Sequence, residues 1–131
     1  MGEKIDGRSD IPEHVRSLIR RQIDSVAELE AILLLRKSPE REWSADQAGA
    51  RLYVSPAVAA YVLAMLARKG FFEEQEDCYR YAPVDPELRR DVDDLAQIYS
   101  IDLVSVTNLI HAKPGASVLE FARAFQLRRD K

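Results

Sequence analysis

The residue types that perform acid–base, nucleophilic or metal chemistry are few in this sequence and far apart. Its two histidines, His14 and His111, and its one cysteine, Cys78, show none of the HxxxH or CxxC spacings that zinc ligands need. Three aspartates within residues 91–94 lie beside apolar positions at helical spacing, which favours a solvent-exposed helix face. The sequence has no glycine-rich phosphate loop and no nucleophile elbow. We therefore expect no enzyme, no cofactor and no metal site.

Contact with DNA is a second chemistry that the sequence allows. A helix that begins after Ser55 would point backbone N–H groups at a phosphate, and scattered arginines would add charge. The residues that would contact DNA are Arg16, Arg20, Arg21, Arg51, Ser55, Tyr61 and Arg68. Basic residues of this kind are also typical of solvated helix surfaces, and the net charge of −3 gives no general attraction for a polyanion.

Residues 52–67, LYVSPAVAAYVLAMLA, carry no formal charge and include the helix that would read DNA bases. Positions 59, 62, 63 and 66 recur at helical spacing and are expected to face the core. The opposite side is then Ala57, Val58, Ala60, Tyr61, Ala64 and Met65. It offers no arginine, lysine, asparagine or glutamine for contact with base edges. We expect this side to be covered, either by a protein partner or by the chain's own C-terminal helices or a second subunit.

The segment 71–81 is predicted to form a hairpin, with strands at 71–74 and 78–81 joined by a polar tip. Within it four carboxylates, those of Glu73, Glu74, Glu76 and Asp77, stand against one cation, Arg80. Such a cluster is repelled by phosphates, so the hairpin argues against DNA contact. An acidic hairpin that only aids solubility is the alternative.

Capping signals predict where the helices that position these residues begin. One signal is Ser or Asp followed three residues later by Glu or Gln, and another is Ser followed by Pro. These signals predict helix starts at Asp10, Ser25, Ser44, Ser55 and Ser117. For the first of them we expect Glu13 at the third helical position. The helix after Ser55 should end at Lys69, with Gly70 as a left-handed cap. Trp43 is expected in the core.

A long helical pattern follows Pro86. Apolar residues there step by four, three and four positions, the spacing of a helix–helix seam, and the register slips around residues 100–102. The slip indicates either a bend or a break. The seam is expected to join two copies of the chain in a homodimer through Leu88, Val92, Leu95, Tyr99, Leu103, Val106 and Ile110.

The stretch SADQAGARLYVSPAVAAYVLAMLARKGFF, residues 44–72, resembles the winged helix-turn-helix superfamily. Ser44 would begin the first helix of the motif, Ala48 would let the two helices cross closely, and Ser55-Pro56 would begin the second. The flanking helices resemble, in arrangement only, regulators of the MarR and PadR type. The resemblance implies a mainly α protein with a small β-hairpin wing (α+β) and flanking helices at both ends. Tyr53 departs from the pattern, since a small or turn-forming residue is usual there.

The length of 131 residues fits one domain, and 47% hydrophobic with 31% charged residues is ordinary for a globular protein. We divide the chain into a flexible tail (1–9), a winged-helix domain with an N-terminal helix (10–83) and a C-terminal helical dimerisation or packing region (84–131). The polar start does not resemble a signal peptide, so we expect a cytoplasmic protein. The predicted function is that of a regulatory winged-helix protein acting mainly through protein contacts. A DNA-binding repressor of the MarR or PadR type is the alternative.

Overall fold

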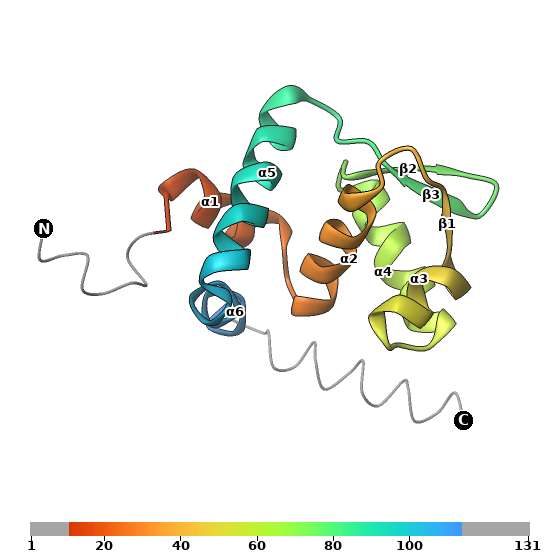
Figure 1. The fold of residues 1–131 in the computed structure, drawn as a ribbon, viewed down its shortest axis with the longest axis horizontal. Coiled ribbons are helices and arrows are strands. Elements are labelled where there is room, and N and C mark those ends of the chain that lie inside the picture. Colours follow the sequence, from red (N-terminus) through yellow and green to blue (C-terminus); the bar gives the residue numbers. More distant parts are fainter. Residues whose placement is uncertain (1–10, 114–131) are drawn as a thin grey trace, which may run out of the picture.

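The computed structural model describes residues 11–113, which form six helices and one small sheet (Figure 1). In chain order these are α1 (Glu13–Gln22), α2 (Val26–Lys37), β1 (Trp43–Ser44), α3 (Ala45–Leu52), α4 (Pro56–Arg68), β2 (Phe72–Gln75), β3 (Cys78–Tyr81), α5 (Pro86–Ile101) and α6 (Leu103–His111). Figure 1 shows α2 at the centre, with α1, α5 and α6 on one side of it and α3, α4 and the sheet on the other. The expected mainly helical class with a small β-hairpin is confirmed.

Side-chain caps begin α2, α3 and α4 as predicted. The Ser25 hydroxyl accepts from the Glu28 N–H at 3.2 Å, and the Ser55 hydroxyl accepts from the Val58 N–H at 3.2 Å. At Ser44 the capping box is complete, because the Gln47 side chain also accepts from the Ser44 N–H at 3.1 Å. These short-range bonds satisfy N–H groups that a helix cannot satisfy itself.

The predicted start of α1 was wrong in register. The helix begins at Glu13, so this residue is the first helical residue and not the third, and Pro12 stands at the N-cap without a side-chain hydrogen bond. Proline fixes φ near −65°, which suits a helix start. Asp10 lies outside the described residues, as do the expected tail at 1–9 and the expected last helix after Ser117.

The turn between α3 and α4 consists of three residues, Tyr53 to Ser55, and the two helices bend by 106° there. Ala48 is buried, as the predicted close crossing requires, but the tightest approach is at Gly49. A Cβ at Gly49 would lie 2.9 Å from the carbonyl oxygen of Val54 and 3.4 Å from the Ala59 Cβ. Any larger residue would push the turn away from α3.

The hairpin is closed by a two-residue turn at Glu76 and Asp77, which both have positive φ (53° and 67°). This is the pattern of a type I′ turn, whose twist matches that of the strands. Pairing is antiparallel, and β1 adds to the free edge of β3, which gives the order β1-β3-β2. Gln75, expected in the tip, ends β2 instead.

One hydrophobic core runs through the described residues. Trp43, Phe71, Tyr79 and Tyr81 bury their side chains between the sheet and the helices α2 and α4. The guanidinium carbon of Arg41 lies 3.6 Å from the centre of the Trp43 ring system and that of Arg51 5.5 Å, so two cations contact this indole. The expected core role of Trp43 is confirmed.

The register slip in the C-terminal pattern is a break. α5 ends at Ile101, and Asp102 caps α6 by accepting from the Ser105 N–H at 3.2 Å. The break lets α6 turn back, and both α5 and α6 pack on α1. Within residues 11–113, no single helix has the length and apolar composition that crossing a membrane requires.

Candidate functional site

The outward side of α4 is the surface on which the sequence predicted partner contacts. Ala57, Ala60 and Tyr61 are exposed there, and Ala64 and Met65 are half-buried. Nearly half of the Tyr61 surface (49%) is open to solvent, so neither α5 nor α6 supplies the cover expected for it. We call Ala57, Ala60, Tyr61, Ala64 and Met65 the α4 face.

Val58 does not belong to this surface, which corrects the prediction. Its side chain is only 5% exposed and lies in the core. The reason is helical spacing: Val58 stands one turn before Val62, which is itself fully buried. The core positions predicted for α4, Ala59, Val62, Leu63 and Leu66, are all buried.

Tyr53, in the turn just before the α4 face, is the most exposed large apolar residue described, at 92%. Its backbone is left-handed, with φ 61° and ψ 41°. Only glycine adopts this region readily, and for other residues it costs on the order of 1 kcal/mol or more. Sequence reasoning marked Tyr53 as unusual for the turn but did not include it among the partner contacts. A bulky aromatic at a position that suits glycine was the available signal.

The hairpin beside α4 is acidic on its exposed surface, as predicted. Glu73, Glu74, Glu76 and Asp77 are all exposed, and α4 packs directly against β2. One of the four carboxylates, that of Glu73, pairs with Arg80 across the strands. The other three give this end of the molecule a negative surface next to the apolar α4 face.

The residues that would contact DNA do not come together. Arg16, Arg20 and Arg21 lie on α1, on the far side of α2 from α4 (Figure 1). Arg20 also pairs with Glu13 at 2.8 Å. The remaining four, Arg51, Ser55, Tyr61 and Arg68, do belong to α3, α4 and the turn between them. The set is therefore divided between α1 and the α3–α4 region, although Arg21 lines the same hollow as Lys69 at the end of α4.

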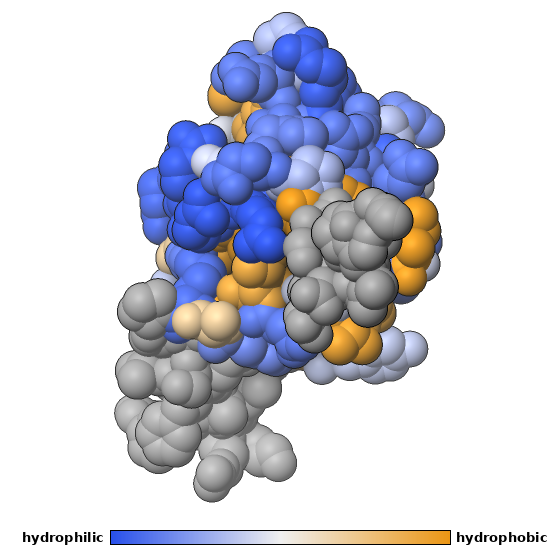
Figure 2. All heavy atoms as spheres, turned by 90° about the vertical axis from the view of Figure 1, so that its left-hand side faces the viewer, coloured by the Kyte–Doolittle hydropathy of each residue, from blue (hydrophilic) through white to orange (hydrophobic). Residues whose placement is uncertain are grey.

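Most residues of the predicted dimer seam pack inside a single chain. Val92, Leu95, Val106 and Ile110 are fully buried, because the break at Asp102 folds α5 and α6 onto α1. Leu88 and Tyr99 are half-buried and only Leu103 is exposed. The corner between α5 and α6 instead exposes Ile101, Leu103 and Val104. Figure 2 views the molecule from the left-hand side of Figure 1 and shows apolar side chains at several places on that face, among polar ones.

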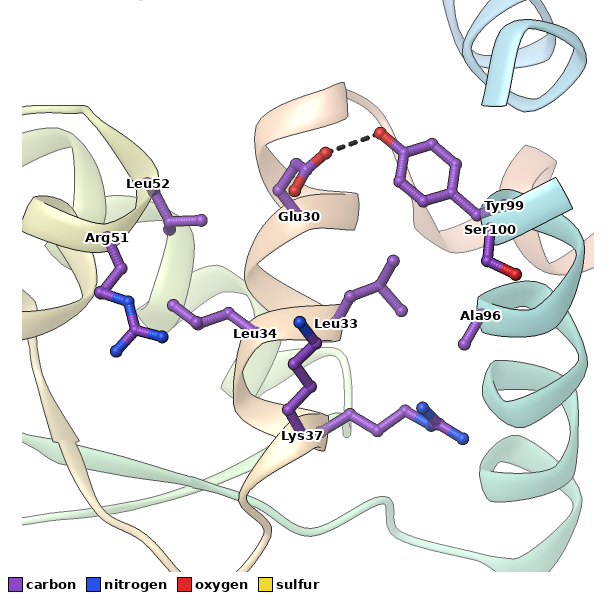
Figure 3. Close-up of a pocket in the computed structure, with 10 residues that line it drawn as sticks. Glu30, Leu33, Leu34, Lys37, Arg51, Leu52, Ala96, Tyr99 and Ser100 are labelled. Atoms are coloured by element: carbon purple, nitrogen blue, oxygen red, sulfur yellow. Dashed lines mark hydrogen bonds between the residues drawn. The ribbon is translucent and has the colours of Figure 1, made fainter. Parts of the chain in front are cut away.

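A groove runs along the outward side of α2, and no pattern in the sequence predicts it (Figure 3). Its floor is Leu33 and Leu34 of α2; one wall is Arg51 and Leu52 of α3, and the other includes Ala96, Tyr99 and Ser100 of α5. The volume is about 370 Å³. We call it the α2 groove.

The two ends of the α2 groove carry opposite charge. At one end the Tyr99 hydroxyl donates to the Glu30 carboxylate at 2.6 Å. Burial, this hydrogen bond and the charge of Glu30 raise the pKa of Tyr99 to about 12, so the hydroxyl stays protonated. The other end holds Arg36, Lys37 and Arg51. Arg36 pairs with Asp93 at 2.9 Å, whereas within residues 11–113 Lys37 and Arg51 make no ion pair with a carboxylate.

A charged junction ties the helices together away from both surfaces. The Lys113 ammonium donates to the carbonyls of Ile19 and Ile23 and to Asp24, at 2.6 to 2.8 Å. The Lys69 ammonium donates to the Gln22 carbonyl at 2.7 Å, and to Asp24 and the buried Glu28 at 3.3 Å. Two cations thus close the C-terminal end of α1, where helix carbonyls lack partners.

The Asp24 carboxylate shows how this junction acts on acidity. Partial burial alone would raise its pKa, but the hydrogen bonds and charges of Lys113 and Lys69 outweigh burial and lower it. The junction therefore favours the ionised carboxylate. Sequence reasoning missed the junction because its members lie up to 94 positions apart.

The structure also shows the surroundings of a histidine and of the cysteine. His14 meets Asp94 at 2.7 Å across α1 and α5, which its position in the sequence did not suggest. Cys78 is half-buried in β3. Across residues 11–113, no three His, Cys, Asp or Glu side chains are grouped so that they could hold a metal ion.

Comparison of the chain with protein-family models, with curated proteins and with solved structures finds no match. The geometry of the α4 face, the hairpin and the α2 groove is thus the basis for assigning a function.

Proposed function

We propose that this chain is a winged helix-turn-helix protein that works through protein contacts, with the α4 face as its docking surface. The architecture supports the first part. The order of α2, β1, α3, α4 and hairpin is that of the winged helix, and α3 and α4 are joined by a three-residue turn at 106°, within the range of helix-turn-helix motifs. The sheet order places β1 beside β3, so the hairpin is anchored to the motif as a wing.

The main support for the proposal is the chemistry of the exposed part of α4. The side that would read DNA presents alanines and Tyr61, with no group for bidentate base contacts. The wing beside it presents the carboxylates of Glu74, Glu76 and Asp77 where phosphates would approach. An apolar strip beside an acidic wing suits a protein partner and repels a nucleic acid.

Tyr53 gives independent support. The fold keeps an aromatic ring 92% exposed in a backbone conformation that glycine adopts at lower cost. The left-handed backbone closes α3 through the Tyr53 and Val54 N–H bonds to the Gly49 carbonyl, but this cap would form with glycine too and does not require a tyrosine. Strain of this type is retained at functional positions, and tyrosine is enriched among the residues that dominate protein interfaces.

The charges identify the kind of partner. A surface that meets the α4 face would also meet the acidic wing, because α4 packs on β2. We therefore assign a protein partner that carries basic side chains next to an apolar patch. The homodimer through the α5 and α6 seam is not proposed, since its central residues are buried within one chain.

A mobility-shift titration against genomic fragments at low and physiological salt tests the choice between protein and DNA. We expect no sequence-dependent binding. Nanomolar, sequence-dependent binding with a steep salt dependence would contradict the proposal and favour the DNA-binding repressor.

Site-specific photocrosslinking in cells that express the chain tests the surface itself. A photoreactive amino acid at Tyr61 is expected to give a discrete protein adduct, and the same group at Arg90, on the exposed side of α5, serves as the matched control. Glu74→Lys with Glu76→Lys should abolish the adduct at position 61. An adduct that persists in this variant, or that forms equally from position 90, would remove the α4 face from consideration.

A further inference from the structure

The α2 groove is distinct from the α4 face, because its lining residues come from α2, α3 and α5 and none of them belongs to α4. α2 is apolar on two sides. Leu29, Ile32 and Leu35 face the core, while Leu33 and Leu34 are only half-buried and form the floor of the groove. A helix that is apolar on both sides is normally covered on both. No element between residues 11 and 113 covers the floor.

The dimensions of the groove suit a helix. Its floor runs from Glu30 to Lys37, about 10 Å along α2 at 1.5 Å per residue, which corresponds to two turns of a docked helix. Walls from α3 and α5 rise on the two sides (Figure 3). Amphipathic helices bind such grooves with apolar residues at i, i+3 or i+4, and i+7.

The charge of the groove selects among such helices. Lys37 and Arg51 stand at one end, and neither is neutralised by a carboxylate between residues 11 and 113. An occupant with carboxylates at this end would form charge-assisted hydrogen bonds with Lys37 and Arg51, so the groove favours an acidic helix over a basic one.

The chain's own C-terminal segment has the wrong charge for this position. Residues 114–131 carry four basic residues, Arg123, Arg128, Arg129 and Lys131, against two acidic ones, Glu120 and Asp130. Three of the four basic residues lie in the last four positions, so the segment would bring cations to the groove. The same argument applies to this segment from a second copy of the chain.

We propose that the α2 groove binds an amphipathic helix of a separate protein, with apolar residues over Leu33 and Leu34 and carboxylates at Lys37 and Arg51. This inference does not depend on the function proposed for the α4 face. The two surfaces give the protein one docking site for a basic partner and one for an acidic partner.

Fluorescence anisotropy with two designed peptides tests the inference. Both are labelled helices of about 15 residues with leucines at i, i+3, i+4 and i+7. One carries glutamates on the flanking positions, and the other carries lysines at the same positions. We expect the glutamate peptide to bind the 131-residue chain at least about tenfold more tightly than the lysine peptide, with weaker binding at higher salt.

Variants locate the binding site. Lys37→Glu with Arg51→Glu should weaken the glutamate peptide at least about tenfold and improve the lysine peptide, whereas Arg90→Glu, an exposed charge reversal on α5, should change neither. Leu33→Gln should weaken both peptides, and circular dichroism confirms that each variant is folded. Equal binding of the two peptides to the wild type, or an equal effect of Arg90→Glu, would overturn the proposal. An effect of Tyr61→Asp as large as that of the double reversal would move the site to the α4 face, which also overturns it.

Discussion

The α4 face and the α2 groove are both apolar surfaces on helices whose other side forms the core, yet their borders have opposite charge. α4 packs against β2, whose hairpin exposes Glu74, Glu76 and Asp77, whereas the α2 groove ends at Lys37 and Arg51. The shared apolar centre indicates that both surfaces suit contact with protein. The charges beside the apolar centre then determine which kind of protein binds, because like charges across an interface are costly even where the apolar fit is good.

Replacing Leu63 and Tyr61 separately by alanine tests the contrast between the two sides of α4. Leu63 is fully buried, so Leu63→Ala should lower the free energy of unfolding by about 3 kcal/mol through the lost contacts and the cavity. Tyr61→Ala on the exposed side should cost less than about 1 kcal/mol. Urea denaturation measures both. Similar losses would show that Tyr61 is covered in solution and that the α4 face is not a free surface.

The junction around Lys69 and Lys113 should hold both surfaces in one rigid body. Lys69→Met removes a partner of the buried Glu28 carboxylate, and we expect a loss of about 2 kcal/mol of stability. Lys37→Met, the matched change in the α2 groove, should change stability by less than about 0.5 kcal/mol, because this lysine makes no ion pair among residues 11–113. If the two changes cost the same, the junction does not hold α1, α2 and α4 together.

The acid response of the junction is a smaller effect. Because the folded pKa of Asp24 is lowered from 3.8, its carboxylate stabilises the fold fully above the ordinary aspartate pKa. This stabilisation is lost as the pH falls below 3.8 and through the lowered value. Its size is on the order of 1 kcal/mol or less, since Asp24 is partly exposed and solvent screens it.

Thermal unfolding from pH 7 to pH 2 measures this response. Asp24→Asn should lower stability at neutral pH and flatten the acid decline, whereas Asp77→Asn, at the tip of the acidic hairpin, should leave the decline nearly unchanged. The reverse result would place the acid-sensitive carboxylates in the hairpin and not in the junction.

The smallest change expected is at Tyr53. Tyr53→Gly places at φ 61° the residue that this conformation favours, so stability should rise by up to about 1 kcal/mol. The same substitution removes the exposed ring, so the photocrosslinked adduct at position 61 should weaken. The α2 groove should still bind the glutamate peptide as before. A destabilised variant would mean that the Tyr53 ring makes packing contacts in the folded protein.

Features with local causes were predictable from the sequence. The capping box of Ser44 and Gln47 and the Ser55-Pro56 helix start depend on atoms three residues apart, and the burial of Tyr79 and Tyr81 follows from strand alternation. These local patterns predicted the ends of most helices and of the hairpin strands within one or two residues. The candidate α4 face followed from helical spacing, except for Val58.

Features that arise from tertiary packing were not predictable. The α5 and α6 seam is as apolar as a dimer interface would be. In the structure, the break at Asp102 folds both helices onto α1, which covers the seam. The α2 groove combines side chains from Glu30 to Ser100 on three helices. No periodicity in the sequence marks such an assembly.

The contact of Arg41 and Arg51 with Trp43 has an optical consequence. Trp43 is the only tryptophan in the chain, and its indole is buried beneath two guanidinium groups. One of them, Arg51, is also a wall of the α2 groove. A carboxylate that draws Arg51 away from the ring changes the electric field at the indole, and with it the wavelength and intensity of its emission. The protein thus carries its own unlabelled fluorophore for occupancy of the groove, with Arg51→Lys as the variant that should weaken the signal.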